Sequence, residues 1–453
     1  MNLSSVILYI IGLLWLHLTD AKIGYFWHIT DLHYDPFHNS PEFHRGCKHS
    51  RGTNEHSHRN GRHRDHTCDS SWALIQSAAA FMSERHPDTL EFVLWTGDIL
   101  SSSMEHMSEE FKLEAVRNVT DVLSRTFSSQ FVFPALGHND PPPSRRLVDM
   151  WMQWLPTEAL RTFETGGYYT IEQSHSKLRI VVLNSVLWAG GAARSDGSHS
   201  HRGRAQWDWL EDVLLEARKK KEMVYLVAHA GPGVEERHNA GSSSASGGGE
   251  LIPSANARLL HVIKGFSDII AGQFYGHRHA DTFRLIYRDG RPVSWALLAP
   301  SLTPRGAGSI SNPGLRLYKF DSNTGKVLDY TQYYLDVTNT RGEAHWAVEY
   351  NLTQYYGLRE VSATSLEALA ERIRNHNDRG VFAKYLTALR VRHSQDISEC
   401  DSACVHVHYC AITRADYHEF RACVRNPASA LASRAAHNSA AIFVYAILIV
   451  LTS

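Results

Sequence analysis

Short apolar runs alternate with longer amphipathic stretches along the first two thirds of the chain. The apolar runs, rich in β-branched and aromatic residues, predict strands at 23–27, 92–96, 131–136, 178–183, 223–228, 269–275, 282–287 and 295–299. The amphipathic stretches predict helices at 71–85, 109–127, 145–155, 206–221 and 254–266. Strands and helices alternate early and hairpin-like strands follow, which predicts an α/β fold with a mixed sheet layered with helices.

Both ends of the chain resemble processing signals. Residues 3–18 are apolar and lead to small residues around position 21, so 1–21 is predicted to be a secretory signal peptide, with a membrane anchor as the alternative. Residues 440–451 are apolar and uncharged, behind a polar spacer and a triplet of small residues at 428–430. This arrangement predicts a GPI-anchor signal over 428–453, with a non-functional apolar tail as the alternative. We therefore expect an exported chain on the outer face of the cell membrane.

The six cysteines fit an exported protein, because they are even in number and clustered by position. Local pairing predicts the disulfides Cys47–Cys68, Cys400–Cys404 and Cys410–Cys423, with a zinc site built from the last four cysteines as the alternative. The pattern turns helical from about residue 365, so a main domain at 22–364 and a small disulfide-bearing helical subdomain at 365–427 are predicted. Asn118 and Asn351 begin glycosylation sequons, which are used only in a secretory lumen.

Composition excludes one class of partner. The formal net charge is −1 at pH 7, and without a basic excess no nucleic-acid polymer is expected to bind. The segment 38–66 is rich in histidine among Arg, Lys and Gly. Its simplest interpretation is a solvated insertion closed by a disulfide, and a weak metal- or anion-binding loop is the alternative.

Five of the predicted strands end in short polar motifs. In chain order these are Asp31-Leu32-His33, Gly97-Asp98, Gly137-His138-Asn139-Asp140, His229 and Gly276-His277-Arg278-His279. The carboxyl ends of strands in open α/β sheets gather ligands, so these side chains are expected to meet. Two divalent cations need a bridging carboxylate with nitrogen and oxygen ligands on each side. The order of motifs therefore predicts a dinuclear metal site, with Asp98 placed to bridge.

With these motifs the sequence resembles the calcineurin-like metallophosphoesterases, whose pattern is DxH, GD, GNH(D/E), H and GHxH. More narrowly it is similar to the acid sphingomyelinase-like phosphodiesterases, nearest to their GPI-anchored b form, over nearly the whole mature chain. The resemblance implies a sandwich of mixed β-sheets flanked by helices and a phosphoric diester hydrolase, expected as a monomer. It also implies the ligand sets of the two metals. Asp31, His33 and His279 would hold one metal, His229 and His277 the other, and Asp98 would bridge.

The resemblance also bears on the metal. Ser101 stands where purple acid phosphatases carry a metal-binding tyrosine, three residues after the Asp of GD. Without tyrosinate, and with ligands rich in histidine, two Zn²⁺ ions are the expected cofactors.

One motif departs from the family pattern, because the family's Asn and His are exchanged. By position, His138 replaces the metal-binding amide and Asn139 replaces the histidine that resembles a general acid. Asn cannot deliver a proton, and general acid catalysis is worth about 10²–10⁴-fold. Three interpretations stay open: nucleotide-like or activated diesters remain substrates when lipid diesters do not, the loop shifts by one residue and recovers both roles, or the enzyme is inactive.

The sequence therefore predicts a surface-anchored phosphodiesterase with a metal-bridging hydroxide as nucleophile. Its substrates would be phosphodiester or phosphoanhydride bonds of nucleotides, or phospholipid and sphingolipid head groups. The alternative is a GPI-anchored regulatory protein that binds phosphate or lipid and turns over negligibly, because GNH is replaced by GHN.

Overall fold

The computed structural model describes residues 22–38, 68–86, 88–173, 176–190, 197–236, 250–305, 311–337, 344–375, 378–393 and 400–426. The predicted signal peptide, most of the histidine-rich segment, Cys47 and the predicted GPI-anchor signal lie outside these ranges. Within the described ranges, no helix combines the length and the apolar character needed to cross a membrane.

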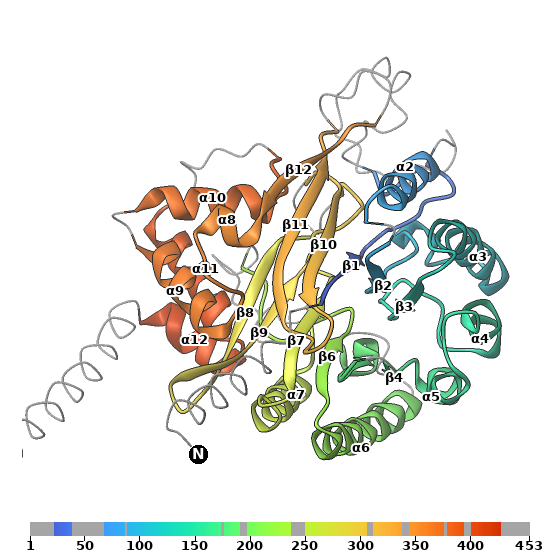
Figure 1. Cartoon of the computed structure of the whole chain (residues 1–453), viewed down its shortest axis with the longest axis horizontal. Coiled ribbons are helices and arrows are strands. Elements are labelled where there is room, and N and C mark those ends of the chain that lie inside the picture. Colours follow the sequence, from blue (N-terminus) through green and yellow to red (C-terminus); the bar gives the residue numbers. More distant parts are fainter. Residues whose placement is uncertain are drawn as a thin grey trace, which may run out of the picture.

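Two six-stranded sheets form the centre of the molecule (Figure 1). The first has the order β12 (Trp346–Asn351), β11 (Val327–Leu335), β10 (Gly314–Asp321), β1 (Ile23–Ile29), β2 (Leu90–Trp95), β3 (Phe131–Pro134). The second has the order β4 (Tyr169–Glu172), β5 (Leu178–Val182), β6 (Met223–Val227), β7 (Ile270–Tyr275), β9 (Arg291–Leu298), β8 (Thr282–Arg288). Strands β1, β2 and β3 are parallel, as are β5, β6, β7 and β9, so the two sheets each bring several carboxyl ends to one edge.

Aromatic side chains fill the space between the sheets. Phe26 of β1 is fully buried and stacks on Phe92 of β2 with ring centroids 4.8 Å apart. On its other side it meets Phe274 of β7 edge to face at 5.4 Å. Because burying a ring of this size stabilises the fold by roughly 1.5–3 kcal/mol, these contacts fix how the two sheets face each other.

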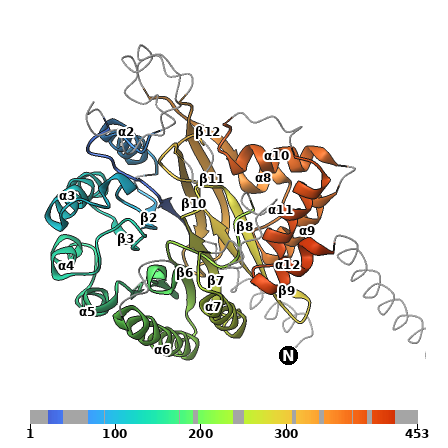
Figure 2. The ribbon, with the colours of Figure 1, turned by 180° about the vertical axis from the view of Figure 1, so that it is seen from behind.

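Helices cover the outer faces of the sheets (Figures 1 and 2). Beside the first sheet lie α2 (Trp72–Ser83), α3 (Glu109–Thr126) and α4 (Arg145–Trp151), and α5 (Thr157–Gly166) lies against β4 at the edge of the second sheet. Beside the second sheet lie α6 (Gly197–Lys220) and α7 (Pro253–Gly265). Short 3₁₀ turns follow β2 and β5, η3 (Ser102–Met104) and η4 (Ser185–Trp188).

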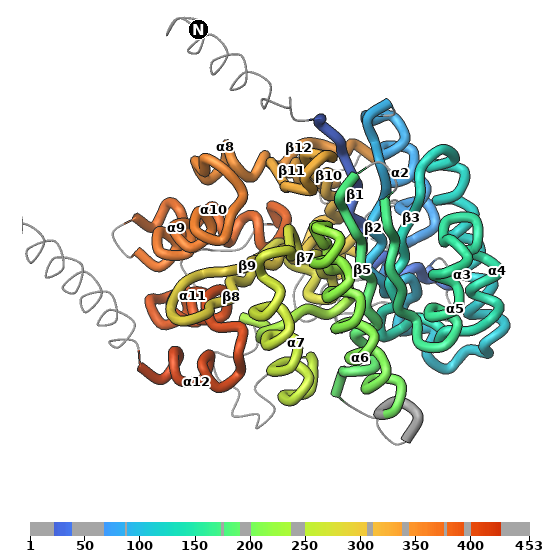
Figure 3. Tube along the Cα trace, turned by 60° about the horizontal axis from the view of Figure 1, so that its bottom comes forward, coloured from blue at the N-terminus to red at the C-terminus, as the bar shows by residue number. Residues whose placement is uncertain are grey.

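Further helices follow β12 in the described part of the chain; two of them lie against β8 and β9, and one lies against β11 and β12 (Figure 3). These helices are α8 (Leu352–Tyr356), α9 (Ala363–Arg374), α10 (Arg379–Leu389), α11 (Ser402–Thr413) and α12 (Tyr417–Arg425). The disulfide Cys400–Cys404 joins the residues before α11 to the first turn of that helix, and Cys410–Cys423 joins α11 to α12. Cys68 is also disulfide-bonded, and its predicted partner Cys47 lies outside the described residues. The alternative of a zinc site from the last four cysteines is therefore wrong.

The predicted fold class is confirmed: mixed sheets are flanked by helices, and a helical C-terminal region carries disulfides. The sequence missed β4, β10, β11 and β12, and α6 begins at Gly197 rather than at residue 206. Strands β10 and β11 were hidden by buried polar residues. Arg316 and Gln332 are both 0% exposed and bond to each other at 2.9 Å, which breaks the apolar alternation of a half-buried strand. The domain boundaries at 364 and 427 stay predictions.

Candidate metal centre

The seven predicted metal ligands lie in loops at the carboxyl ends of five strands. Asp31 and His33 follow β1, Asp98 follows β2, His138 follows β3, His229 follows β6, and His277 and His279 follow β7. Both sheets contribute, so the loops meet where the two sheets face each other. Two groups of side chains result, and within each group the candidate ligand atoms lie within 4.8 Å of one another.

Backbone hydrogen bonds tie these loops together. Asp31 and His33 donate their N–H groups to the carbonyls of Gly97 and Asp98, both at 3.0 Å. His277 donates its N–H to Asp31 Oδ2 at 2.8 Å, which connects the β7 loop of the second sheet to the β1 loop of the first. The position of each loop is therefore set by its neighbour and not by its own sequence alone.

Five of the seven predicted ligands have a positive φ. The angles are 50° for Asp31, 44° for His33, 49° for Asp98, 68° for His277 and 50° for His279. A left-handed conformation disfavours a non-glycine residue and persists only where the surroundings enforce it. Strain concentrated at these residues is typical of a functional site.

The motif glycines allow the loops to approach closely. A Cβ atom at Gly137 would overlap the carboxylate and backbone of Asp98, and one at Gly276 would overlap Thr30 and the carboxylate of Asp31. Any larger residue at either position would separate the loops that carry the carboxylates.

The first group consists of Asp31, His33 and His279. His33 Nε2 and His279 Nε2 lie 3.1 Å apart, and Asp31 Oδ1 lies 3.2 Å from His279 Nε2. All three residues are buried, with exposed fractions of 0%, 7% and 6%. His279 Nδ1 bonds to the carbonyl of Arg305 at 2.9 Å, which leaves Nε2 facing the group.

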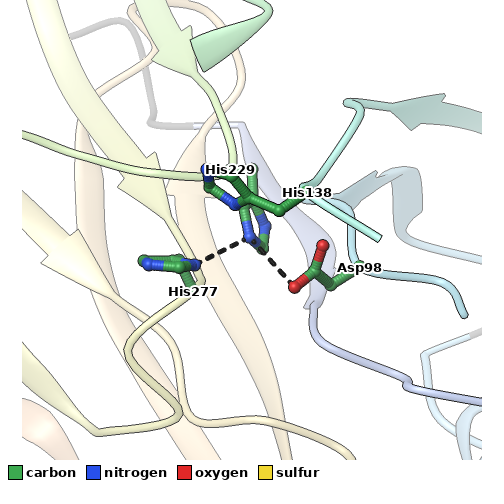
Figure 4. A group of neighbouring side chains, drawn as sticks. All are labelled: Asp98, His138, His229 and His277. Carbon is green, nitrogen blue, oxygen red and sulfur yellow. Dashed lines mark hydrogen bonds and ion pairs between the residues drawn. The ribbon is translucent and has the colours of Figure 1, made fainter. Parts of the chain in front are cut away.

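The second group consists of Asp98, His138, His229 and His277 (Figure 4). His229 Nε2 lies 3.0 Å from His277 Nδ1 and 3.4 Å from Asp98 Oδ2. His229 Nδ1 bonds to the carbonyl of Thr96 at 2.7 Å, so its ring, too, is held with Nε2 facing the group.

Asp98 connects the two groups through a single atom. Its Oδ2 lies 3.5 Å from His33 Nε2 in the first group and 3.4 Å from His229 Nε2 in the second. This is the position that a carboxylate bridging two cations would take.

The donor atoms fit a pair of cations. Asp31 Oδ1 is buried and accepts no hydrogen bond within the described part of the chain. Tetrahedral ligands about 2.0–2.1 Å from a zinc ion lie about 3.3 Å from each other. The nitrogen pairs His33–His279 and His229–His277, at 3.1 and 3.0 Å, are close to that spacing.

Charges in the site shift the histidine pKa values in opposite directions. Burial opposes protonation of His229 and His33, but the carboxylates of Asp98 and Asp31 outweigh burial and raise the pKa of His229 to about 10 and of His33 to about 9. Burial and the charges of His138 and His229 lower the pKa of His277 to about 4, against the influence of Glu250. Two of the candidate ligands therefore hold protons at neutral pH that a cation must displace.

The exchanged residues both lie in the site. The ring of His138 is centred 4.7 Å from that of His277 and belongs to the second group. Asn139 donates its backbone N–H to Asp98 Oδ1 at 3.0 Å and its Nδ2–H to Asp98 Oδ2 at 3.2 Å. The imidazole thus lies among the candidate ligands, and the amide lies against the carboxylate of Asp98.

Sequence reasoning missed Glu250, which precedes α7. Its Oε1 lies 3.0 Å from His138 Nε2, and its Oε2 lies 3.1 Å from His277 Nε2. A single glutamate after the Ser/Gly-rich stretch 240–249 has no spacing that marks it, so only the fold reveals this contact.

Comparison with known proteins agrees with this geometry. The family described as "Calcineurin-like phosphoesterase" matches residues 24–281, which include all seven predicted ligands. The chain belongs to this family. A second family, described as "Acid sphingomyelin phosphodiesterase C-terminal region", matches residues 291–430 and thus covers the C-terminal helices.

Curated relatives cover almost the whole chain. A cyclic GMP-AMP phosphodiesterase of Bos taurus is 33% identical over 431 residues, covering 90% of this chain and 92% of the relative. Acid sphingomyelinase-like phosphodiesterase 3b of Homo sapiens is 32% identical, covering 89% and 90%. Sphingomyelinase phosphodiesterase C of Dictyostelium discoideum is 27% identical, covering 93% and 98%.

The prediction of a phosphoric diester hydrolase related to the acid sphingomyelinase-like phosphodiesterases is thereby confirmed. Membership of the family also implies a dinuclear metal site. The first two relatives match almost equally well, so identity alone does not favour the b form. The roles of the individual ligands and of Asn139 stay predictions.

Proposed function

We propose that this chain is a dinuclear zinc phosphodiesterase that cleaves nucleotides or the head groups of phospholipids and sphingolipids. The observation that carries the proposal is the position of Asp98 Oδ2 between the two groups. Zinc is favoured because four of the seven candidate ligands are buried or half-buried imidazoles that face a neighbouring ligand atom, and because Ser101 offers no phenolate. Ser101 instead donates its hydroxyl to Asp69 at 2.6 Å.

The cations, when bound, would act as Lewis acids toward the phosphoryl oxygens and lower the pKa of water. The protein's own contribution is orientation. The carbonyls of Thr96 and Arg305 hold the rings of His229 and His279. The Asp31 carboxylate is fixed by Thr30 and the His277 N–H, at 2.7 and 2.8 Å. Such fixed donors stabilise transition-state charge without rearranging during the reaction.

The substrate ranking follows from Asn139, whose amide cannot protonate a leaving group. Sphingomyelin and cyclic GMP-AMP, the substrates that relatives' names suggest, both release alkoxides that need a proton. Phosphoanhydrides and aryl diesters release groups that need little help. We therefore expect faster turnover of nucleotide phosphoanhydrides and activated diesters than of alkyl diesters.

A second candidate is a GPI-anchored regulatory protein that binds phosphate or lipid. It is favoured by one observation: the position of the family's acid is held by an amide that bonds to Asp98. Such a protein would keep both metals and turn over negligibly.

We further propose that the chain is secreted, anchored by GPI, glycosylated and monomeric. The disulfides in the C-terminal helices support passage through an oxidising compartment. Asn118 is exposed on α3, whereas Asn351 is half-buried and bonds to Thr331 at 2.7 Å, so Asn118 is the better glycan acceptor of the two.

The test is a zinc-loaded assay of the secreted protein without its C-terminal tail. It compares an aryl phosphodiester, ATP, cyclic GMP-AMP and sphingomyelin, each with Asp98→Asn beside wild type and with the exposed Asp149→Asn as a matched control. Turnover that is lost in Asp98→Asn alone supports the phosphodiesterase. No turnover on any substrate, with two zinc ions still bound, supports the binding protein.

A further inference from the structure

We propose that Glu250 is a positioning residue that completes the second metal centre by holding His138 and His277. The inference rests on the proposed two-metal function and adds a residue to it. Glu250 lies outside the five strand-end motifs and reaches the site from the segment before α7.

The carboxylate of Glu250 divides its two oxygens between two rings. Oε2 lies 3.1 Å from His277 Nε2, while Nδ1 of the same ring lies 3.0 Å from His229 Nε2. The ring thus points one nitrogen at the carboxylate and the other at the metal ligands. In a neutral imidazole the proton then sits on Nε2, and Nδ1 keeps the lone pair that a metal needs.

His138 is arranged in the same way. Its Nε2 lies 3.0 Å from Glu250 Oε1, within ion-pair distance, and both ring nitrogens are buried without an aligned hydrogen bond in the described part of the chain. A proton on Nε2 leaves Nδ1 unprotonated and available to a cation. One carboxylate therefore sets the same tautomer in both rings and keeps them adjacent, with centroids 4.7 Å apart.

The contact between Glu250 and His138 bears on the position where this chain has a histidine and the family pattern has an asparagine. The family has Asn where this chain has His138, and an amide has no imidazole tautomer to set. A histidine at this position has two possible ligand atoms and two ring orientations, so it gains more from a carboxylate that selects one of them.

The backbone around Glu250 is itself held on two sides. Gly190 donates its N–H to the Glu250 carbonyl at 3.1 Å. Tyr417, on α12, donates its hydroxyl to the carbonyl of Leu251 at 2.9 Å. The C-terminal helices therefore support the segment that carries Glu250, although the described part of this region provides none of the predicted ligands.

The experiment measures metal binding, with zinc as the probe. Zinc is titrated against a chromophoric chelator for wild type, Glu250→Gln and Glu250→Asp, and cobalt absorption spectra report the geometry of the sites. Glu211→Gln, which removes a carboxylate paired with Arg258 on α6 and α7, is the matched control. Thermal unfolding with excess chelator verifies that each variant folds.

We expect Glu250→Gln to lower the affinity for one of the two zinc ions by about 10–100-fold and to leave the affinity for the other unchanged. Glu250→Asp keeps the charge but is too short to reach both rings, so it should lose affinity as well. In a His138→Asn background the effect of Glu250→Gln should shrink, because one of its two partners is gone. Tyr417→Phe should lower the affinity for the same zinc ion by a smaller factor.

Two results would overturn the inference in distinguishable ways. If wild type binds two zinc ions and Glu250→Gln binds both with unchanged affinity, Glu250 has no positioning role and the proposed function stands. If wild type binds fewer than two zinc ions, the proposed function fails and this inference fails with it. An equal loss in Glu211→Gln would also overturn it, because the effect would then not belong to the site.

Discussion

The two groups of candidate ligands differ in burial and in how they are held. In the first group, Asp31, His33 and His279 are almost inaccessible and are fixed by backbone partners. In the second group, the side chains of His138 and His277 are 23% and 21% exposed, and Glu250 beside them is 28% exposed. The first group is thus part of the core, whereas the second combines two buried members, Asp98 and His229, with two that reach solvent.

The two groups also differ in how closely they follow the family pattern of motifs. The buried group matches the family pattern at every position, and any change there would disturb core packing. The open group carries the exchange of Asn and His, and two of its members contact the carboxylate of Glu250. We expect substrate to approach from the open side, so the exchange at His138 and Asn139 lies where it can alter substrate choice or turnover.

The largest effect should come from the residue that both groups share. Asp98→Asn removes one charge from the oxygen that joins them and should lower turnover on an aryl diester by about 10³-fold, since a metal site contributes several kcal/mol to catalysis. Asp149→Asn should leave the rate unchanged. Wild-type turnover in Asp98→Asn would show that the two groups act independently.

The second largest effect should come from restoring the family pattern in the open group alone. The double substitution His138→Asn with Asn139→His returns a proton donor to position 139 and an amide to position 138. We expect turnover on sphingomyelin or cyclic GMP-AMP to rise by about 10²-fold and turnover on an aryl diester to change little. An equal gain on both substrates would mean that the exchange affects metal binding rather than proton transfer.

A third prediction uses a buried histidine that belongs to neither group. His28 bonds to Thr96 at 2.9 Å, and burial together with the charge of Arg316 lowers its pKa to about 3. Below pH 6.5 the unfolded chain binds a proton there that the folded chain does not, so stability is lost as the pH falls. Between pH 7 and pH 5 the loss from this residue should be about 2 kcal/mol.

Denaturant unfolding at both pH values measures this loss, with His28→Gln as the variant that cannot titrate. The difference in the free energy of unfolding between pH 7 and pH 5 should be smaller in the variant by about 2 kcal/mol. An unchanged difference would mean that His28 is protonated in the folded protein or contributes nothing to acid unfolding.

The fourth prediction rests on pKa values that are raised rather than lowered, and it concerns the site itself. The raised pKa values of His33 and His229 mean that each group holds a proton at neutral pH in chelator-treated protein. Metal must displace it, so affinity should rise about tenfold per pH unit for each proton released between pH 6 and 8. Titration calorimetry in buffers of different ionisation enthalpy should report about one proton per metal, and no proton release at pH 7 would contradict this.

Spacing and order along the chain were enough to find the residues of both groups. Each motif follows an apolar strand, and strand ends converge whatever the loops between them do, so Asp31, Asp98 and His229 could be placed from the sequence. The sheet was harder to predict, because Arg316 is buried in β10 and breaks the alternation on which strand prediction depends. Glu250 could not be found, because its contact depends on the path of α7 and not on any local pattern.

The exposure of the second group could not be predicted either. Five ligands adopt positive φ angles that the neighbouring loops impose, and no propensity of Asp or His indicates which will do so. The exchange at His138 and Asn139 is visible in the sequence, but its consequence depends on where each side chain lies relative to Asp98.

Everything proposed for the site depends on two cations sharing the carboxylate of Asp98. Anomalous diffraction from crystals of the zinc-loaded protein, recorded on both sides of the zinc absorption edge, tests it most directly. We expect two zinc peaks about 3.5–4 Å apart, with Asp98 between them and one peak against each group. A single peak, or two peaks that do not both contact Asp98, would contradict it.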